Sequence, residues 1–485
     1  MLGLGIGIER VLSFVSVTLA ARIGGPQAFG GYAVTLATAG AIAAYAGAGI
    51  GVTAVRFSGD YRPGSAGYRQ FVKALGVIAI CSALIAALFT FVGAGPIARW
   101  LLGNGDLAVV IRVAAISAGA MVLLDCCRGL LLGQQKFYGL LLLSLVSGVG
   151  LIVALPLASR IGATAMVTVQ GSVALLTVIV FMVASPRLGI RPTSPAENDA
   201  PVPIRQVFAF GLVQFSAFAG ISIATWCIAS FVARADSSLK QMAFYSVANQ
   251  WRGLAAMAPG LLTQVIYSSL TNKSSEPFGG PDRVLLSTTL ITAILVMLCG
   301  GLAIVGLPWI LPLVYGHRYA GAETAVSLLL ATSIIHMSGQ PAAQRLSIVR
   351  LRAIGIVNLI WSSLLIVFGF ALIRGQAATG AAIAFLIAHF ASNVLVAAFL
   401  YREKTLPSGY FVTIGVATIG ALTMAALAYL RANSSSHVAS MTAWIALCWL
   451  LAIASTSLLA LRHRRASRTH ELPAQSQEIP SFSEA

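Results

Sequence analysis

Charged residues are scarce in this chain of 485 residues, and acidic residues are the scarcest of them. Lys, Arg, Asp and Glu together make up 9% of the sequence, and only 14 residues are Asp or Glu. Hydrophobic residues make up 58%, and the mean hydropathy is +0.89. A water-soluble protein of this size would have to expose large apolar patches to carry that composition, so the soluble globular class is excluded.

Cysteine pairs and long polar loops are also lacking. The six cysteines lie in or beside apolar segments without metal-ligand spacing, so we expect no metal site, no disulfide framework and no cofactor. The longest connections are about twenty residues and lack the clusters of acidic or His residues that a membrane glycosyltransferase or polysaccharide polymerase would use. We therefore expect no catalytic residues and no enzyme.

A net charge of +17 would suit a nucleic-acid partner, but the basic residues do not form a stripe. They are scattered singly over short loops, so no nucleic-acid partner is expected. If the N-terminus is cytoplasmic, twenty of the 31 Lys and Arg residues fall in cytoplasmic segments and eight in outer segments. Because basic residues concentrate on the cytoplasmic side of membrane proteins, this distribution predicts that both termini are cytoplasmic.

Apolar stretches of about 20 residues recur along the chain, and each could cross a hydrocarbon core of about 30 Å as a helix. Hydropathy predicts fourteen such spans between residues 4 and 461. Twelve or thirteen remain alternatives, because Pro308 and Pro312 interrupt the segment that follows Leu307. The predicted fold class is all-α integral membrane.

The sequence also contains an internal repeat. The stretch from Arg128 to Ala165 is similar to that from Arg345 to Ala381, and Phe29-Gly30-Gly31-Tyr32 is similar to Ala243-Phe244-Tyr245 at an offset of 213 residues. Both pairs are separated by nearly the same number of residues, which corresponds to six spans. Because six is an even number, the two copies should have the same orientation in the membrane and form two lobes with parallel topology. The predicted divisions are a first six-helix lobe at 1–184, a cytoplasmic linker at 185–206, a second six-helix lobe at 207–400, two additional helices at 401–461 and a cytoplasmic tail at 462–485.

A family resemblance rests on the stretch from Gly24 to Tyr32 (GGPQAFGGY), followed by Gly47, Gly49 and Arg56. This stretch resembles the start of bacterial polysaccharide exporters, the O-antigen-type flippases of the MOP superfamily. Further matches lie at residues 128–139, 243–248, 313–319 and 379–384, so that the resemblance extends over about 400 residues. Each motif alone is degenerate, and their order and spacing make the resemblance specific.

The resemblance implies two six-helix bundles in a V, similar to those of multidrug transporters, that alternate their access across the bacterial inner membrane. The implied cargo is an oligosaccharide on a polyprenyl diphosphate, moved to the outer leaflet for cell-surface polysaccharide such as O-antigen or exopolysaccharide. The implied partners are this lipid-linked sugar, membrane lipids, and a glycan polymerase with its export machinery. The alternative is an ion-coupled multidrug antiporter of the same superfamily, which would need carboxylates in its lobes; only Glu9 and Asp125 approach that role.

Three arginines, Arg10, Arg112 and Arg252, lie inside predicted spans, where an isolated charge is costly and usually functional. Arg10 is the leading candidate for a phosphate ligand in a cationic cavity. The run from Glu9 to Ile23 is similar to the first helix of lipid II flippases, where a cavity arginine occupies the matching position. As alternatives, Arg10 pairs with Glu9 or reaches the cytoplasmic headgroups.

Arg252 is the counterpart of Arg10 in the second lobe, near the middle of the eighth span. Asn249 and Gln250 lie within about one turn of it, so we include both in the predicted cavity. The resemblance to lipid II flippases places their arginine nearer Gln250, which leaves the assignment open. Arg112 is a further candidate.

Asp125 and Arg128 lie at the inner end of the fourth span and share one helix face. This spacing predicts a mutual ion pair that acts as a structural latch, and Glu9 is a further candidate for ion pairing or gating. For His336 and His389, in the tenth and twelfth spans, hydrogen bonds between helices are favoured over a proton relay.

Overall fold

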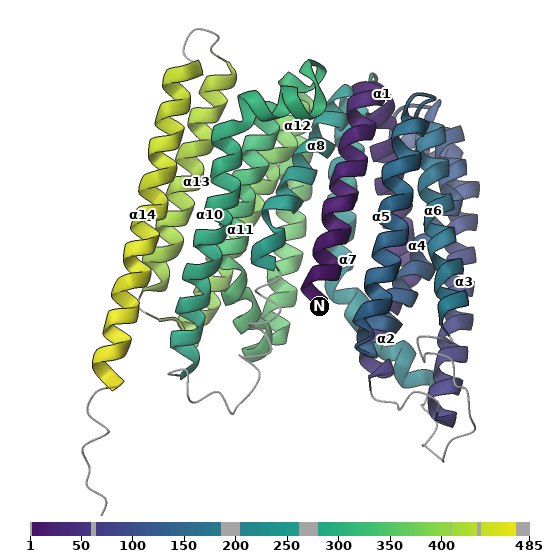
Figure 1. Ribbon diagram of the computed structural model, residues 1–485, viewed down its shortest axis with the longest axis horizontal. Coiled ribbons are helices and arrows are strands. Elements are labelled where there is room, and N and C mark those ends of the chain that lie inside the picture. Colours follow the sequence, from purple (N-terminus) through teal and green to yellow (C-terminus); the bar gives the residue numbers. More distant parts are fainter. Residues whose placement is uncertain are drawn as a thin grey trace, which may run out of the picture.

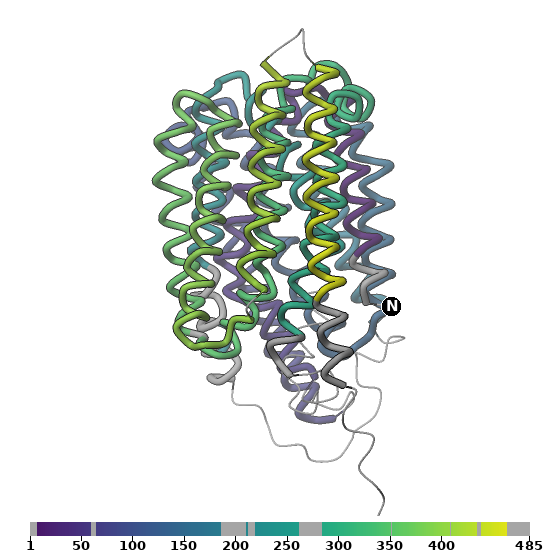
Figure 2. The backbone as a smooth tube through the Cα atoms, turned by 90° about the vertical axis from the view of Figure 1, so that its left-hand side faces the viewer, coloured from purple at the N-terminus to yellow at the C-terminus, as the bar shows by residue number. Residues whose placement is uncertain are grey.

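The long helices of the computed structural model run side by side and nearly along one direction (Figures 1 and 2). The structure describes residues 2–59, 65–185, 204–260, 280–407, 409–433 and 438–471. The elements within these ranges are α1 (Leu2–Gly47), α2 (Ile50–Ser58), α3 (Ala66–Pro96), η1 (Ile97–Leu101), α4 (Leu107–Gly133), α5 (Phe137–Ser159), α6 (Ala163–Ala184), α7 (Ile204–Ala235), α8 (Lys240–Ala255), α10 (Gly280–Tyr315), η3 (His317–Ala322), α11 (Glu323–Val349), α12 (Leu351–Arg402), α13 (Tyr410–Ala432) and α14 (Val438–Glu471). All are helical, so the all-α prediction is confirmed.

Two of these helices, α1 and α12, are each long enough to cross a membrane twice. They contain 46 and 52 residues, whereas one crossing takes about 20. α1 bends back at Gly25, whose φ is 75°, and the following Pro26 suits the first position of a new helical segment. α12 bends at Ala377, with φ 42° and ψ −116°. Each helix therefore supplies two crossings.

Ten helices of the described chain are long and apolar enough to span a membrane, and α1 and α12 are among them. α7, with its apolar part at Ala219–Ala235, lies at the predicted seventh span, and α8, with 16 residues, lies at the described part of the eighth, so each of the fourteen predicted spans contains a described helix. Pro308 and Pro312 do not end the helix that contains them, because α10 extends through both prolines. Much of the predicted linker and tail lies outside the described residues.

The helices form two lobes that meet along a central seam (Figure 1). One lobe contains α1 to α6, and the other contains α8 and α10 to α12, with α13 and α14 on its outer side. α1 and α8 lie side by side at the seam. α7 packs mainly against α12 of the second lobe, but its Phe210 also reaches Phe57 of α2, with 5.6 Å between ring centroids.

The duplication is visible in the backbone of the turns at the end of the bundle opposite the N-terminus, which we call the outer end (Figure 1). The six turns that follow spans 1, 3, 5, 7, 9 and 11 each contain one residue with positive φ, a conformation that strains most side chains. These residues are Gly25, Gly103 and Gly162 in the first lobe and Leu239, Gly316 and Ala377 in the second, 213 to 215 residues later. This interval agrees with the offset of the sequence echoes.

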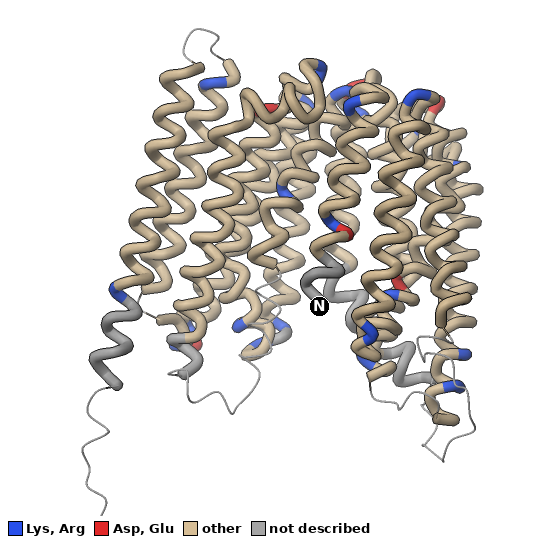
Figure 3. The backbone as a smooth tube through the Cα atoms, viewed as in Figure 1, with Lys and Arg blue, Asp and Glu red and all other residues tan. Residues whose placement is uncertain are grey.

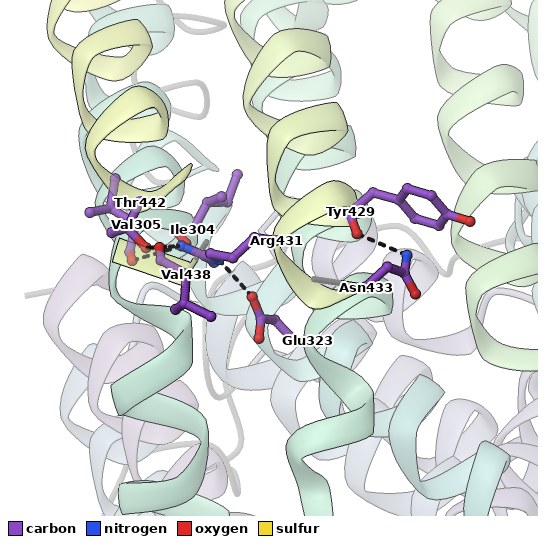
Figure 4. Close-up of polar contacts among 8 residues, drawn as sticks. All are labelled: Ile304, Val305, Glu323, Tyr429, Arg431, Asn433, Val438 and Thr442. Atoms are coloured by element: carbon purple, nitrogen blue, oxygen red, sulfur yellow. Dashed lines mark hydrogen bonds and ion pairs between the residues drawn. The ribbon is translucent and has the colours of Figure 1, made fainter. Parts of the chain in front are cut away.

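A buried arginine, Arg431, fastens the last two helices to the second lobe (Figure 4). Pro308 has no N–H to donate, so the carbonyl of Ile304 in α10 lacks its usual helical partner. Arg431 of α13 replaces that partner, donating from Nη2 to the Ile304 oxygen at 2.9 Å. Its Nε also binds Glu323 of α11 at 2.8 Å, and its Nη1 donates to Thr442 of α14 at 3.2 Å. One guanidinium therefore ties four helices together.

Candidate functional site

Arg252 of α8 lies close to the middle of the transmembrane region. It follows Lys240, at the outer end of α8, by twelve residues, which corresponds to a depth of about 18 Å. A hydrocarbon core of about 30 Å would place it near the centre. Figure 3 shows that Lys and Arg gather toward the two ends of the bundle and that few of them lie near its middle.

The guanidinium of Arg252 is held in place by neighbours that leave part of it available. Its Nε donates to Oδ1 of Asn249 at 2.8 Å, and its Cζ lies 5.1 Å from the ring centroid of Phe385 in α12. The aromatic face stabilises the cation without neutralising it. No carboxylate of the described chain forms an ion pair with Arg252. Its Nη groups therefore remain free to bind an anion.

Arg252 and Asn249 open into a cavity of about 340 Å³ at the seam. The second half of α1 contributes only small residues to its wall, which leaves the room that the cavity occupies. α7 contributes the hydroxyl-bearing Ser222 and Thr225, and α8 adds Ser246. The lining contains one cation and no acidic residue. Such a chamber is suited to a group that is anionic and rich in hydrogen-bond acceptors.

Gln250, also expected in this cavity, faces elsewhere. Its Oε1 accepts a hydrogen bond from the hydroxyl of Tyr315 at 3.3 Å, and that hydroxyl accepts one from Thr18 at 3.2 Å. Gln250 thus helps to join α1, α8 and α10. The reason is helical geometry: Asn249 and Arg252 are three residues apart and share a face, whereas Gln250 points about 100° away from Asn249.

Arg10 lies on the face of α1 that is directed toward the other lobe. One turn further along the same face, Phe14 packs edge-on against Trp251 of α8, with ring centroids 5.5 Å apart. Leu19, about 180° around the helix from Arg10, is exposed on the opposite face. Arg10 is itself exposed and makes no hydrogen bond or ion pair with the described residues. It does not line the cavity of Arg252, but lies on the same seam at a greater depth from the outer end.

The predicted ion pair between Asp125 and Arg128 is wrong. Arg128 instead pairs with Glu9 of α1, whose other carboxylate oxygen accepts a hydrogen bond from Ser144 of α5 at 3.2 Å. The sequence shows that Asp125 and Arg128 are neighbours in one helix, but it does not show that Glu9, 119 residues away, lies beside Arg128. The pair joins α1 to α4 and α5 inside the first lobe, and Glu9 is thus unavailable to Arg10.

Asp125 has a different structural role, at the start of α2. Its carboxylate accepts a hydrogen bond from the backbone N–H of Gly51, in the first turn of that helix. A negative charge is favourable there because the first N–H groups of a helix are unpaired and its dipole is positive at that end. A Cβ on Gly51 would lie 2.3 Å from an Asp125 oxygen, so only glycine permits this approach.

Arg112 is apart from the cavity. It lies in the second turn of α4 and shares an exposed face with Val109 and Ile116, at helical spacing. The long side chain of an arginine near a helix end can reach the headgroup region from such a face. The structure therefore does not bring Arg112 together with Arg252.

The two histidines meet near the Arg252 cavity. The rings of His336 and His389 are 4.6 Å apart, and Nε1 of Trp361 donates to Nδ1 of His389 at 3.3 Å. His389 also stacks on Phe385, the ring that faces Arg252. The histidines thus form contacts between α11 and α12.

Trp226 of α7 is the residue that sequence reasoning missed. It lines the Arg252 cavity, an apolar groove and an outer cavity of about 540 Å³. Its Nε1 donates to the hydroxyl of Thr38 in α1 at 3.2 Å, which joins α7 to the first lobe. The outer cavity also contains Arg234 and Arg374. No motif in the sequence distinguishes this tryptophan from the six others.

Comparisons with known proteins agree with the fold. A family model described as "Polysaccharide biosynthesis protein" matches residues 1–271, whereas no curated protein matches the chain. A solved structure of lipid II flippase MurJ in an inward closed conformation is similar with a TM-score of 0.62 and 14% identity, covering 97% of this chain and 99% of that one. An inward-facing multidrug resistance MATE transporter of the MOP superfamily has a TM-score of 0.60 and 16% identity, covering 83% and 97%. At these identities the structures show the fold alone.

The family model covers more than half of the sequence, and both structures have a similar fold. These findings also agree with the resemblance carried by the Gly24 to Tyr32 stretch. The chain belongs to the polysaccharide biosynthesis protein family, and its fold of many apolar helices is similar to those of a lipid II flippase and a MATE transporter.

Proposed function

We propose that this protein is a flippase that moves a lipid-diphosphate-linked oligosaccharide from the cytoplasmic to the outer leaflet by alternating access between its two lobes. The observation that carries the proposal is the seam cavity, which presents Arg252 without any acidic residue in its lining. The diphosphate of such a lipid is the anionic, acceptor-rich group that this chamber suits. MurJ, which has a similar fold, is named as a lipid II flippase, and this supports the substrate class.

The alternative, an antiporter for organic cations, would need a carboxylate that faces the cargo. Three of the glutamates in the described chain are paired with arginines: Glu9 with Arg128, Glu323 with Arg431 and Glu403 with Arg350. The three aspartates whose side chains the structure describes are not available either, because Asp125 binds the start of α2 and Asp106 and Asp236 lie in outer turns. A cationic drug would meet Arg252 and no countercharge, so anionic cargo is favoured.

We further propose that Arg10 makes the first contact with the phosphates. It lies on the seam nearer the cytoplasmic end than the contact between Phe14 and Trp251, and it is exposed and unpaired among the described residues. A headgroup that enters between the lobes from the cytoplasm would meet Arg10 before Arg252. Interactions with two successive cations would compensate for the hydration that an anion loses inside the bilayer.

The proposed location is the bacterial cytoplasmic membrane, with both termini in the cytoplasm. α1 begins and α14 ends toward the same end of the bundle, as an even number of crossings requires (Figure 1). The excess of Lys and Arg in the connections on that side supports this orientation. A membrane potential that is negative inside then favours the outward movement of each negative charge by about 2.3 kcal/mol per 100 mV.

The test is export of surface glycan in cells that depend on variants of this protein, with protein levels matched by immunoblot. Arg252→Gln keeps the size and polarity of the side chain but removes its charge. Loss of one charge-assisted contact of about 1.5 to 3 kcal/mol predicts a fall in export of about 10- to 100-fold. Arg10→Gln should also reduce export, whereas Arg160→Gln, in the exposed turn after α5, should leave it unchanged. Undiminished export in the Arg10 and Arg252 double variant would contradict the proposal.

A further inference from the structure

An apolar groove lies beside the Arg252 cavity. Its volume is about 660 Å³, within the range of ligand sites in proteins, and it runs between the second half of α1, the outer part of α3 with η1, and α7. Ile42 contributes from α1, Ile85 and Phe89 from α3, and Ile223 from α7. No charged residue lines it. Because α1 and α3 belong to one lobe and α7 packs mainly on the other, the groove lies along the seam.

The few polar groups in this groove are already committed to the protein. The Thr38 hydroxyl donates to the carbonyl of Val34 at 2.8 Å and accepts from Nε1 of Trp226 at 3.2 Å. The hydroxyl of Tyr45 donates to the carbonyl of Ala219 at 2.5 Å. Neither offers a strong site to water, and apolar cavities of this kind favour apolar occupants. The groove is therefore suited to a hydrocarbon chain.

The groove and the Arg252 cavity adjoin each other. Ala41 of α1 and Trp226 of α7 line both. A small methyl side chain on one side and an amphipathic indole on the other form the boundary between a polar and an apolar compartment. A ligand with an anionic head and a hydrocarbon tail could occupy both compartments by passing between these two residues.

We propose that the groove is the binding site for the isoprenoid chain of the lipid-linked sugar while its diphosphate occupies the Arg252 cavity. This inference rests on the proposed function and adds the position of the tail. A polyprenyl diphosphate cannot place both of its parts in one solvent, because its tail is excluded from a hydrated cavity and its head from the lipid. Adjacent compartments of opposite character satisfy both parts at once.

Photo-crosslinking tests the position directly. The protein in phospholipid vesicles would be exposed to polyprenyl diphosphate with a diazirine in its tail, and the labelled residues would be mapped by mass spectrometry. We expect labelling at Ile85, Phe89 and Ile223, reduced by unlabelled polyprenyl diphosphate but not by additional phospholipid. Labels confined to other helices, or labels that phospholipid removes equally well, would overturn the assignment, since the groove would then hold ordinary lipid.

A matched pair of variants tests the consequence for binding. Ile85 and its neighbour Leu84 are both exposed on α3, at 60% and 64%, so both positions tolerate a larger side chain, but only Ile85 lines the groove. Ile85→Trp should weaken the binding of polyprenyl diphosphate by about tenfold, since displacing about two methylene groups from an apolar site has that effect. It should leave the binding of inorganic pyrophosphate unchanged. Leu84→Trp should change neither, and equal effects of the two variants would contradict the proposal.

Arg252→Gln separates this inference from the function on which it rests. We expect that variant to weaken the binding of both polyprenyl diphosphate and inorganic pyrophosphate. If Arg252→Gln weakens both but Ile85→Trp has no effect, the groove assignment fails and the proposed function stands. If Arg252→Gln changes neither, the proposed function fails, whatever the groove variant does.

Discussion

Removing the buried guanidinium of Arg431 should destabilise the second lobe more than breaking its exposed ion pair between Arg350 and Glu403. Arg431→Met keeps the apolar part of the side chain but removes four hydrogen bonds, including that to Glu323. The side chain of Arg431 is 1% exposed and that of Glu323 is 16% exposed, so the carboxylate would remain largely buried without a partner. Breaking a buried pair in this way costs about 3 to 5 kcal/mol.

Two further variants test this explanation. In Arg431→Met combined with Glu323→Gln, the unpaired charge is gone, so we expect part of the lost stability to return. Glu403→Gln breaks the pair with Arg350, whose side chain is 60% exposed, and should cost no more than about 1 kcal/mol. The assay is thermal unfolding in detergent, followed by tryptophan fluorescence at a fixed scan rate. The reasoning would be refuted if Arg431→Met unfolded no earlier than Glu403→Gln, or if the double variant were less stable than Arg431→Met.

Three further predictions concern the outer turns. Ala377→Gly should raise the unfolding temperature, because glycine relieves a positive φ of 42° that costs alanine about 1 kcal/mol or more; an unchanged or lower temperature would contradict this. Gly30→Ala should destabilise by about 1 to 3 kcal/mol, since its Cβ would lie 2.0 Å from the Leu239 carbonyl oxygen, whereas Gly76→Ala, with no atom within 4 Å, should be tolerated in the same assay. Partial burial raises the pKa of Asp236, but hydrogen bonds from Ser238 and from the start of α8 outweigh it and hold that pKa below its ordinary value. Its carboxylate therefore stabilises the turn above the ordinary aspartate pKa of about 4 and loses this effect as pH falls through the lowered value, so Asp236→Asn should flatten the acid side of the stability profile.

Most of the helices could be predicted because length and hydropathy indicate which segments can cross a membrane. The depth of Arg252 followed from the same count of residues. The partner of Arg128 could not be predicted, since Glu9 is distant in sequence and only the packing of α1 on α4 brings the two together. The position of Gln250 could have been predicted correctly from helical periodicity, because that spacing places Gln250 on a different face of α8 from Asn249 and Arg252.

The role of Trp226 was beyond prediction for a different reason. A tryptophan in an apolar helix has no distinctive neighbours in the sequence, and its importance arises from three cavities that meet around it. Likewise, the sequence shows Pro308 but not which donor would satisfy the carbonyl that it leaves free. In both cases the missing information is the relative placement of helices that are far apart in the chain.

Trp226 also limits how such a protein can change. Its side chain forms part of the wall of the Arg252 cavity, the apolar groove and the outer cavity, so any replacement reshapes all three at once. If the cargo is the lipid-linked glycan that we propose, selection for a different sugar would therefore alter all three compartments when the substitution falls at this position. Altered selectivity should instead arise at residues that border a single compartment, such as Ser246 or Phe231.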